Sequence, residues 1–222
     1  MKKQKTISVI IPTLNEAEGI GYVLRKMPKE ISEIIVVDGN STDGTVEIAK
    51  KYGARIIIEK RRGYGRAYKT GFKYAKGKII ATLDGDGSYN PKDIIRLVDV
   101  LEKKKVDFVS GNRFRRLGKG SMSFVHYFGN FLISIILNIL FFTKIYDTQS
   151  GMWVFYRNLL KKIKLKENGM SLSSEIKLEA YKKAKFLEYP IYYNKRFGKK
   201  KENTFKQGYS ILRFLFKRRF SL

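Results

Sequence analysis

Short apolar runs alternate with longer amphipathic stretches through the first half of the chain. The runs lie at 7–11, 33–37, 54–58, 78–83 and 106–110. Each is apolar at its centre, as strands buried on both faces of a sheet are, so the pattern predicts five strands. The stretches between them have helical periodicity, at 18–27, 43–51, 65–76 and 90–103. Strands that alternate with helices predict an α/β fold with a mostly parallel central sheet.

The pattern changes after residue 115. Residues 123–142 are apolar with few polar interruptions, mainly His126, Asn130 and Asn138. A helical segment follows at 173–184 and a strand-like one at 186–193, and residues 194–220 carry ten Lys or Arg against one Glu. Because no linker-like tract interrupts the chain, we expect a single domain over 1–222. Its parts are 1–115, 116–205 and a basic amphipathic tail at 206–222.

Composition limits the partners and the metal chemistry. The net charge of +26 suits nucleic acid, an anionic membrane surface or phosphorylated small molecules. A Lys-rich, Cys-free composition is also typical of proteins from heat-loving organisms, which is a second explanation for the charge. With no cysteine and one histidine, disulfides, thiolate zinc sites and His-rich metal sites are excluded. Any metal must be held by oxygen ligands, which suits Mg²⁺ or Mn²⁺.

We expect neither a signal peptide nor a transmembrane helix. The apolar run at the amino terminus ends at Pro12, so it is too short for a signal peptide. The run at 131–142 falls short of the ~20 residues that span a bilayer. Residues 123–142 therefore form either a core helix or helices that lie in a membrane interface. The basic tail is either a docked helix or a membrane-binding segment.

A polar loop follows each of the five predicted strands. The loops read PTLNE, DGNSTDGT, EKRRGYGRA, DGDGS and GNRF in chain order. Ligands of open α/β sheets bind beyond the carboxyl ends of the strands, so we expect these loops to form one site.

The fourth loop places Asp84 and Asp86 one residue apart between glycines. Asp and Gly are common turn formers, so the pattern alone is weak evidence for a site. At a strand end, however, two such carboxylates can hold one hard cation, and that cation can bridge a diphosphate.

Two other loops allow both structural and functional interpretations. Asn15 and Glu16 are ordinary helix-start residues. Asp38, at the end of the second strand, is placed to accept from a base N–H or a ribose hydroxyl, whereas Asp43 is a helix-cap candidate. The arginine-rich third loop lacks the third glycine of a dinucleotide-binding motif and follows the third strand rather than the first. We therefore exclude a dinucleotide-binding fold.

Taken together, the motifs resemble a known family. They are SVIIPTLNE (8–16), IIVVDGNSTDGT (34–45), RRGYGRAYKTGF (61–72), LDGDGSYNP (83–91), SGNRF (110–114), GN (129–130), YDTQSGMWVF (146–155), Glu175 and PIYYNKRFGKKK (190–201). The chain resembles family 2 glycosyltransferases of the dolichol-phosphate mannose synthase type. Those enzymes have the Rossmann-like GT-A fold of nucleotide-diphospho-sugar transferases. Larger relatives continue into carboxyl-terminal transmembrane helices, which we do not expect here.

The resemblance implies roles for individual residues. The nucleotide-sugar pocket and its diphosphate would involve Pro12, Asn15, Glu16, Asp38, Arg62, Gly63, Asp84 and Gly85. Asp84 and Asp86 would bind the metal with Ser88, which stands where relatives often carry Gln. Arg113 would face the acceptor phosphate, and Arg196 the diphosphate or acceptor phosphate. The sugar and acceptor side would include Asp147, Gln149, Ser150, His126 and Lys200.

The implied reaction transfers a hexose to dolichyl or polyprenyl phosphate with inversion and a divalent metal. GDP-mannose is the favoured donor, ahead of UDP-glucose and UDP-N-acetylglucosamine. A phosphate acceptor is already an anion, so this reaction needs no general base. The protein would act at the cytoplasmic face of the cell membrane as a peripheral enzyme on an anionic surface, with a separate membrane protein as a possible partner.

Three alternatives remain at this point. A hydroxyl acceptor, as in polysaccharide synthesis, would need a base, for which Asp147 and Glu175 are the candidates. A catalytically inactive sugar-nucleotide binding module would be expected to have lost its site residues, yet Asp84, Asp86 and Arg113 are intact. Nucleic-acid binding is disfavoured, because acidic residues occupy the strand ends that a polyanion would approach.

Overall fold

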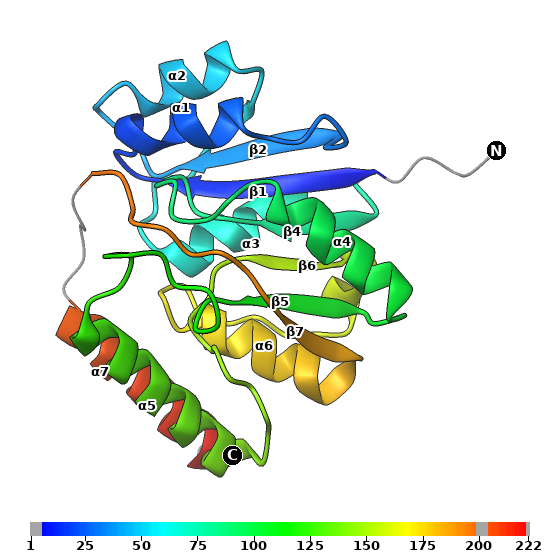
Figure 1. Cartoon of the computed structure of the whole chain (residues 1–222), viewed down its shortest axis with the longest axis vertical. Coiled ribbons are helices and arrows are strands. Elements are labelled where there is room, and N and C mark those ends of the chain that lie inside the picture. The colour runs from blue at the N-terminus through cyan, green and yellow to red at the C-terminus, as the bar shows by residue number, and fades with distance from the viewer. Residues whose placement is uncertain (1–5, 199–203, 221–222) are drawn as a thin grey trace.

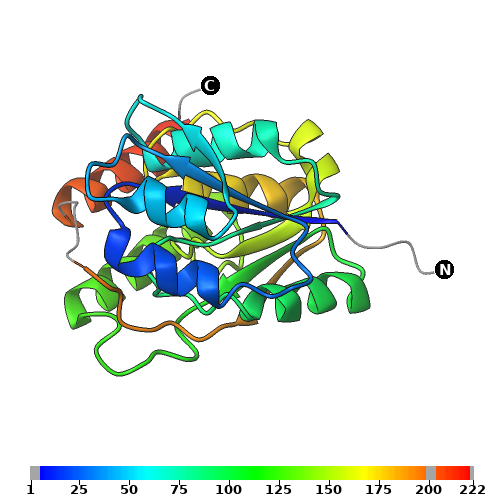
Figure 2. The same ribbon diagram turned by 90° about the horizontal axis from the view of Figure 1, so that it is seen from above.

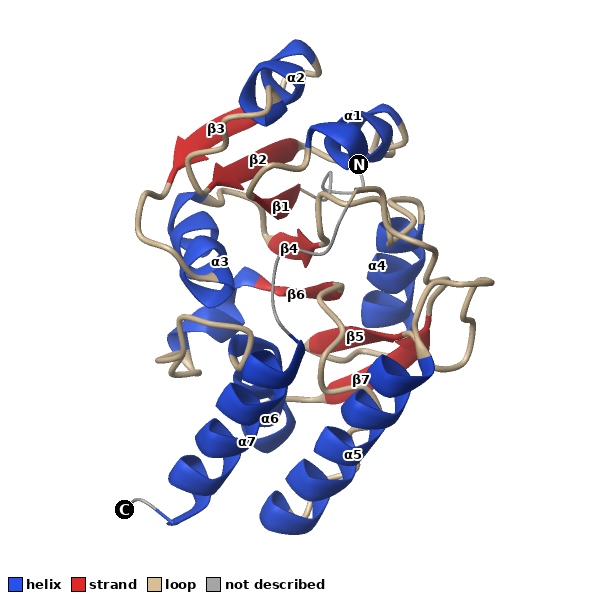
Figure 3. Cartoon of the chain, turned by 90° about the vertical axis from the view of Figure 1, so that its left-hand side faces the viewer, coloured by secondary structure: helices blue, strands red, loops and turns tan. Residues whose placement is uncertain are grey.

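A seven-stranded sheet crosses the molecule (Figures 1 and 3). The computed structural model describes residues 6–198 and 204–220. The strands, in the order β3-β2-β1-β4-β6-β5-β7 across the sheet, are β1 (Ile7–Thr13), β2 (Glu33–Asp38), β3 (Arg55–Ile58), β4 (Ile79–Thr82), β5 (Phe108–Asn112), β6 (Trp153–Tyr156) and β7 (Phe186–Pro190). β6 is antiparallel to β4 and β5, and every other neighbouring pair is parallel. The predicted α/β fold with a mostly parallel sheet is confirmed.

Helices cover both faces of this sheet (Figures 2 and 3). One face carries α1 (Ala17–Arg25), α2 (Thr45–Lys51) and α4 (Asp93–Lys103), and the other carries α3 (Tyr64–Tyr74), α6 (Leu172–Lys183) and the short 3₁₀ helix η1 (Arg157–Lys161). Successive side chains of a strand point to opposite faces, so Val9 and Ile11 enter the first core while Ile10 enters the second. Apolar runs are thus required where a strand is covered on both faces.

The five predicted strands are all present, and the strand-like segment at 186–193 contains β7. The predicted helices correspond to α1, α2, α3, α4 and α6, with small differences at their ends. β6 was not predicted. It has only four residues, and it inserts between β4 and β5 in the opposite direction, which no local pattern reveals.

Two further helices, α5 (Phe124–Phe141) and α7 (Thr204–Phe220), lie side by side below the sheet (Figures 1 and 3). They run in the same direction. His126 Nε2 lies 2.7 Å from Thr204 Oγ1 at their starts, and the guanidinium of Arg219 lies 5.8 Å from the ring centroid of Phe142 at their ends. A third apolar cluster, which includes Leu178 of α6, joins both helices to the domain. Over its described residues, 206–220, the tail is therefore part of a helix docked on the domain.

In the described part of the chain, α5 is the one helix long and apolar enough to cross a membrane by length and composition. The sequence prediction of no transmembrane helix was based on the apolar run at 131–142, and the helix that contains this run is longer. The helix begins at Phe124, where the hydroxyl of Ser123 accepts a hydrogen bond from the backbone N–H of His126. Core helices of soluble proteins pass the same test, so length and composition alone do not make α5 a membrane span.

Close packing of α1 on the loop after β4 gives a test of the fold. A Cβ at Gly19 would lie 2.6 Å from the carbonyl oxygen of Gly85 and 2.8 Å from the backbone of Asp86, whereas a Cβ at Gly21 would make ordinary contacts. Gly19→Ala should therefore lower the free energy of unfolding by about 1–3 kcal/mol relative to Gly21→Ala. Urea denaturation of both variants measures the difference. Equal stability would show that α1 is not packed on this loop as described.

Candidate active site

A cavity of about 800 Å³ opens at the carboxyl ends of β1, β2, β3, β4 and β5. Its sheet side is formed by the loops after these strands, and residues of α5 and α7 line its other side. The loops converge there because parallel strands end at one edge of the sheet. The cavity is thus bounded by polar loops and by apolar helices.

Most of the residues singled out from the sequence line this cavity. They are Pro12, Glu16, Arg62, Gly63, Asp84, Gly85, Asp86, Arg113, His126, Gln149 and Arg196. Asn15, Asp38, Ser88, Asp147 and Ser150 do not line it, and Lys200 lies outside the described residues. Their contacts show what they do instead.

The loop after β4 brings two carboxylates into the cavity. Asp84 Oδ1 accepts hydrogen bonds from the hydroxyls of Tyr64 (3.2 Å) and Tyr68 (3.3 Å). Asp86 Oδ1 accepts from the backbone N–H (2.9 Å) and hydroxyl (2.7 Å) of Ser88. Burial and the charge of Asp86 raise the pKa of Asp84 to about 7. A second carboxylate close to a buried one concentrates negative charge, which favours a bound cation.

These two residues fit a hard divalent metal. The described residues contain no group of three or more His, Cys, Asp or Glu placed to hold an ion, so among these residue types the site would offer Asp84 and Asp86. Mg²⁺ commonly binds through one or two carboxylates together with substrate phosphates and water. The site therefore suits a metal that arrives with, or is completed by, a diphosphate. Ser88 is fully buried behind Asp86 and orients it.

Arg196 supplies positive charge beside these carboxylates. Its Nη2 lies 3.1 Å from Glu16 Oε1, and its Nη1 lies 3.6 Å from Asp86 Oδ2. The flanking backbone is tied to the Asp86 loop, because Phe197 N–H donates to the carbonyl of Asp86 at 2.8 Å and Asn194 N–H donates to that of Ser88 at 2.8 Å. The segment at 194–197 therefore holds Arg196 beside the loop after β4.

Arg113 enters the cavity wall as half of a buried ion pair. Its Nε and Nη2 donate to Asp147 Oδ2 and Oδ1, each at 2.8 Å, and its backbone N–H donates to Oδ2 at 2.9 Å. Burial opposes the charge of Asp147, but Arg113 outweighs it, so the pKa of Asp147 lies below its ordinary value. Asp147 thus holds Arg113 in place and is not available as a base.

Two residues assigned to the nucleotide pocket have structural partners. Asp38 is fully buried, and its carboxylate accepts from the hydroxyls of Thr13 (2.8 Å) and Ser41 (2.6 Å) and from the N–H of Ser41 (2.7 Å). Asn15 Oδ1 accepts from the N–H of Thr42 at 2.8 Å. Both side chains join the loops after β1 and β2, so they shape the pocket from behind.

The segment around Gln149 forms the floor. Gln149 Nε2 donates to the hydroxyls of Ser174 (2.6 Å) and Thr148 (3.2 Å), and the carbonyl of Ser150 accepts from the indole N–H of Trp153 (2.6 Å). Glu175, the second candidate base, accepts the backbone N–H groups of Lys166 and Glu167 with its carboxylate. It organises a loop.

Tyr64 and Tyr68, which contact Asp84, were missed in the sequence. They are four residues apart at the start of α3, directly after the arginine-rich loop, and that helical spacing was the available signal. Gly151 makes room for Tyr64, since a Cβ there would lie 2.4 Å from the Tyr64 hydroxyl.

Comparison with known sequences places the chain in a defined group. The family model described as glycosyl transferase family 2 matches residues 8–164. The low-salt glycan biosynthesis hexosyltransferase Agl6 of Haloferax volcanii is 33% identical over 218 residues, which cover 95% of this chain and 53% of that protein. The dolichyl-phosphate hexose transferase of the same organism is 32% identical over 209 residues, covering 92% and 90%. The chain thus spans about half of Agl6 but nearly all of the second relative.

Solved structures share the fold at low sequence identity. Glucosyl-3-phosphoglycerate synthase from Mycobacterium tuberculosis, in complex with Mn²⁺, UDP and glucosyl-3-phosphoglycerate, has a TM-score of 0.79 at 20% identity and covers 97% of this chain and 80% of that chain. Mannosyl-3-phosphoglycerate synthase from Rubrobacter xylanophilus has a TM-score of 0.79 at 21% identity, covering 96% and 74%. The predicted GT-A fold is confirmed.

The buried ion pair gives a test by mutation and pH. Asp147→Asn leaves the buried Arg113 charge without its partner and should lower the free energy of unfolding at pH 7 by about 3–5 kcal/mol. The exposed Asp99→Asn is the control. Because the folded-state pKa of Asp147 is lowered, its contribution is present above the unfolded-state value and disappears as the pH falls through the folded one. Denaturation should show that the loss of unfolding free energy in Asp147→Asn, relative to the wild type, is smaller at pH 3 than at pH 7. An equal loss at both pH values would refute the Arg113–Asp147 ion pair.

Proposed function

The chain belongs to glycosyl transferase family 2, and on that basis we propose that it transfers a hexose from a nucleotide-sugar to a polyprenyl (dolichyl) phosphate with inversion. GDP-mannose is the favoured donor, ahead of UDP-glucose and UDP-N-acetylglucosamine. The name of the dolichyl-phosphate hexose transferase, which this chain matches over nearly all of that protein's length, supports a lipid phosphate as acceptor.

The observation that carries this proposal is the engagement of every acidic group that lines the described cavity. Glu59 is held by Arg61 and Thr70, whose hydrogen bonds lower its pKa to about 2. Glu16 and Asp86 face Arg196, and Asp84 with Asp86 is assigned to the metal. No carboxylate of the described lining is therefore left over to deprotonate a hydroxyl acceptor. A phosphate monoester is anionic at neutral pH and needs no base.

The arginines match the two phosphate groups of such a reaction. Arg113 Nη1 is the guanidinium nitrogen that Asp147 does not engage, and Arg113 lines the cavity. It would receive the acceptor phosphate, while Arg196, beside the metal loop, would contact the donor diphosphate. An acceptor oxygen then attacks the anomeric carbon as the bond from that carbon to the diphosphate breaks. When bound, Mg²⁺ or Mn²⁺ would stabilise the charge of the leaving diphosphate.

The α5–α7 pair provides a surface for the lipid. Large apolar side chains of both helices are exposed to solvent, namely Phe124, Val125, Phe128, Phe131, Leu132, Ile135, Ile139, Phe205, Tyr209, Phe216 and Phe220. α7 adds Lys206, Arg213, Lys217, Arg218 and Arg219. An apolar face beside basic residues suits peripheral binding to an anionic membrane. Because the same two helices line the cavity, a lipid phosphate would reach Arg113 from this surface.

The first test is sugar transfer from labelled GDP-mannose, UDP-glucose and UDP-N-acetylglucosamine to polyprenyl phosphate. We expect metal-dependent label in the organic phase with one donor, most strongly GDP-mannose. Asp86→Asn should reduce that transfer by about 100-fold or more, because it removes charge at the metal, whereas Asp99→Asn should not. Transfer to a soluble hydroxyl acceptor instead would refute the proposed acceptor class.

Membrane binding is tested by exposed substitutions that leave the core intact. The double variant Phe128→Ser with Ile139→Ser should bind anionic liposomes at least about tenfold more weakly. Each apolar side chain that the membrane buries contributes about 1.5–3 kcal/mol to binding. Ile58→Ser removes an exposed isoleucine on β3, at the opposite end of the molecule, and should leave binding unchanged (Figure 3). Liposome sedimentation measures both. If the double variant and Ile58→Ser weaken liposome binding equally, the α5–α7 surface is not the membrane-binding surface.

A further inference from the structure

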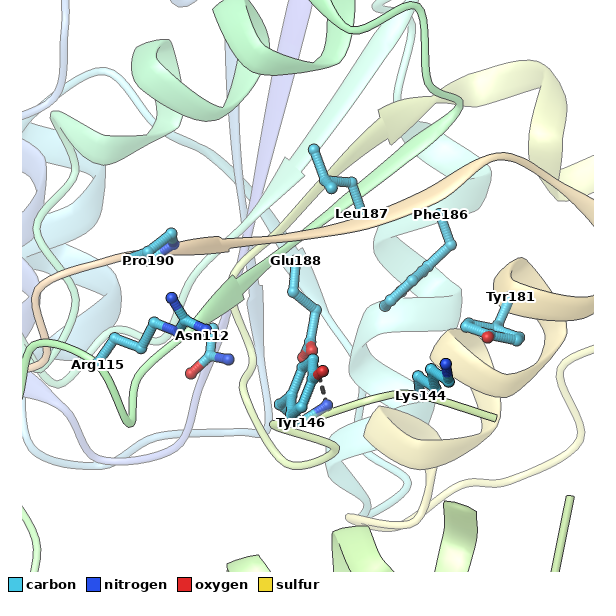
Figure 4. Close-up of a pocket in the computed structure, with 9 residues that line it drawn as sticks. All are labelled: Asn112, Arg115, Lys144, Tyr146, Tyr181, Phe186, Leu187, Glu188 and Pro190. Atoms are coloured by element: carbon cyan, nitrogen blue, oxygen red, sulfur yellow. Dashed lines mark hydrogen bonds between the residues drawn. The ribbon is translucent and has the colours of Figure 1, made fainter. Parts of the chain in front are cut away.

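The peptide of Asp147 is held by two side chains from different elements. Lys177 Nζ, from α6, donates to the carbonyl oxygen of Asp147 at 2.5 Å. Glu188, from β7, accepts the backbone N–H of Asp147 at 2.9 Å and that of Tyr146 at 2.7 Å. Figure 4 shows Glu188 extending from β7 to the backbone at Tyr146. Asp147, which holds Arg113, therefore has both its backbone N–H and its backbone C=O hydrogen-bonded to side chains.

Lys177 is unusual in its environment. It is fully buried and is among the largest side chains with no exposed surface. Burial lowers its pKa to about 7, against the opposing charges of Asp147 and Glu188. Lysine is almost never fully buried without a partner, and buried charges can often be replaced by apolar residues without loss of stability. Stability alone therefore gives little reason for an amine at this position.

Neither Lys177 nor Glu188 lines the active-site cavity. Glu188 instead borders a second cavity of about 310 Å³ that shares no lining residue with the first (Figure 4). Their route to the site is through Asp147, whose carboxylate accepts three hydrogen bonds from Arg113. Movement of the Asp147 peptide would move the guanidinium at the cavity wall.

We propose that Lys177 and Glu188 are positioning residues that clamp the Asp147 peptide and so fix Arg113 in the orientation that receives an anionic acceptor group. The identity of that group as a polyprenyl phosphate rests on the function proposed above. The clamp acts on the acceptor side of the cavity. The donor side is built from other residues, Asp84, Asp86 and Arg196 among them.

The kinetic test separates the two sides. In Lys177→Met, the KM for a water-soluble short-chain prenyl phosphate should rise about 10- to 100-fold, because small displacements of a positioning group have effects of this size. The KM for the nucleotide-sugar should stay within about twofold, and Lys182→Met, an exposed lysine of the same helix, should leave both values unchanged. A parallel rise in both KM values, or no rise in the acceptor KM, would overturn the proposal.

A double variant tests whether the effect passes through Arg113. If Lys177 acts by positioning Arg113, then Lys177→Met combined with Arg113→Lys should be no worse for the acceptor KM than Arg113→Lys alone. Additive losses would mean that Lys177 acts independently, which contradicts the clamp. Where Lys177→Met does not fold, Glu188→Gln serves instead, since it keeps the side-chain shape but loses one of the two acceptors.

A measurement without substrate tests the clamp independently of the proposed function. The Nε–Hε group of Arg113, bonded to Asp147, should give a slowly exchanging NMR signal, assigned by its loss in Arg113→Lys. In Lys177→Met that signal should exchange about tenfold or more faster, and in Lys182→Met it should be unchanged. Faster exchange upholds the clamp even if the wild type transfers no sugar to prenyl phosphate, a result that would refute only the acceptor. Unchanged exchange overturns the clamp.

Discussion

Two acidic side chains at the end of β4 determine how the surrounding part of the site is packed and hydrogen-bonded. Burial and the charge of Asp86 raise the pKa of Asp84, and neighbouring side chains stabilise both carboxylates. Tyrosine hydroxyls donate to one carboxylate, a serine donates to the other, and Arg196 stands beside the pair. Glycines at 85 and 151 allow the loop to be packed this tightly. In the proposed reaction, a divalent cation and a diphosphate would add charges of both signs to this arrangement.

Much of the framework could be predicted from local patterns. The strands covered on both faces must be apolar at successive positions, so Ile10 and its neighbours revealed β1 directly. The loops that follow such strands meet at one edge of the sheet, which is why Asp84, Asp86 and Arg113 could be assigned to a single site from the order of the strands alone. What the pattern reveals is therefore the backbone plan and the residues at its strand ends.

The remaining parts depend on contacts between distant segments. Asp147 looked like a sugar-side residue, but it is locked to Arg113, 34 positions earlier in the chain. Asp38 lies in the predicted loop, yet hydrogen bonds to Thr13 and Ser41 turn its carboxylate away from the cavity lining. The burial of Lys177 was not recognised from the sequence. Polar and apolar residues of α6 are buried alike between Leu172 and Ala180, so its sequence pattern does not mark which polar side chains face solvent. Side-chain partners across such separations are not encoded in local periodicity.

The parallel arrangement of α5 and α7 has a consequence for the order in which the protein is made. The contact between His126 and Thr204 joins residues 78 positions apart. At ribosomal rates of about 5–20 residues per second, that separation corresponds to roughly 4–16 s of translation. During this interval the nascent α5 exposes the side that α7 later covers, as well as the side that remains open in the finished protein. The most apolar helix of the described chain is therefore made well before the partner helix that covers one of its sides.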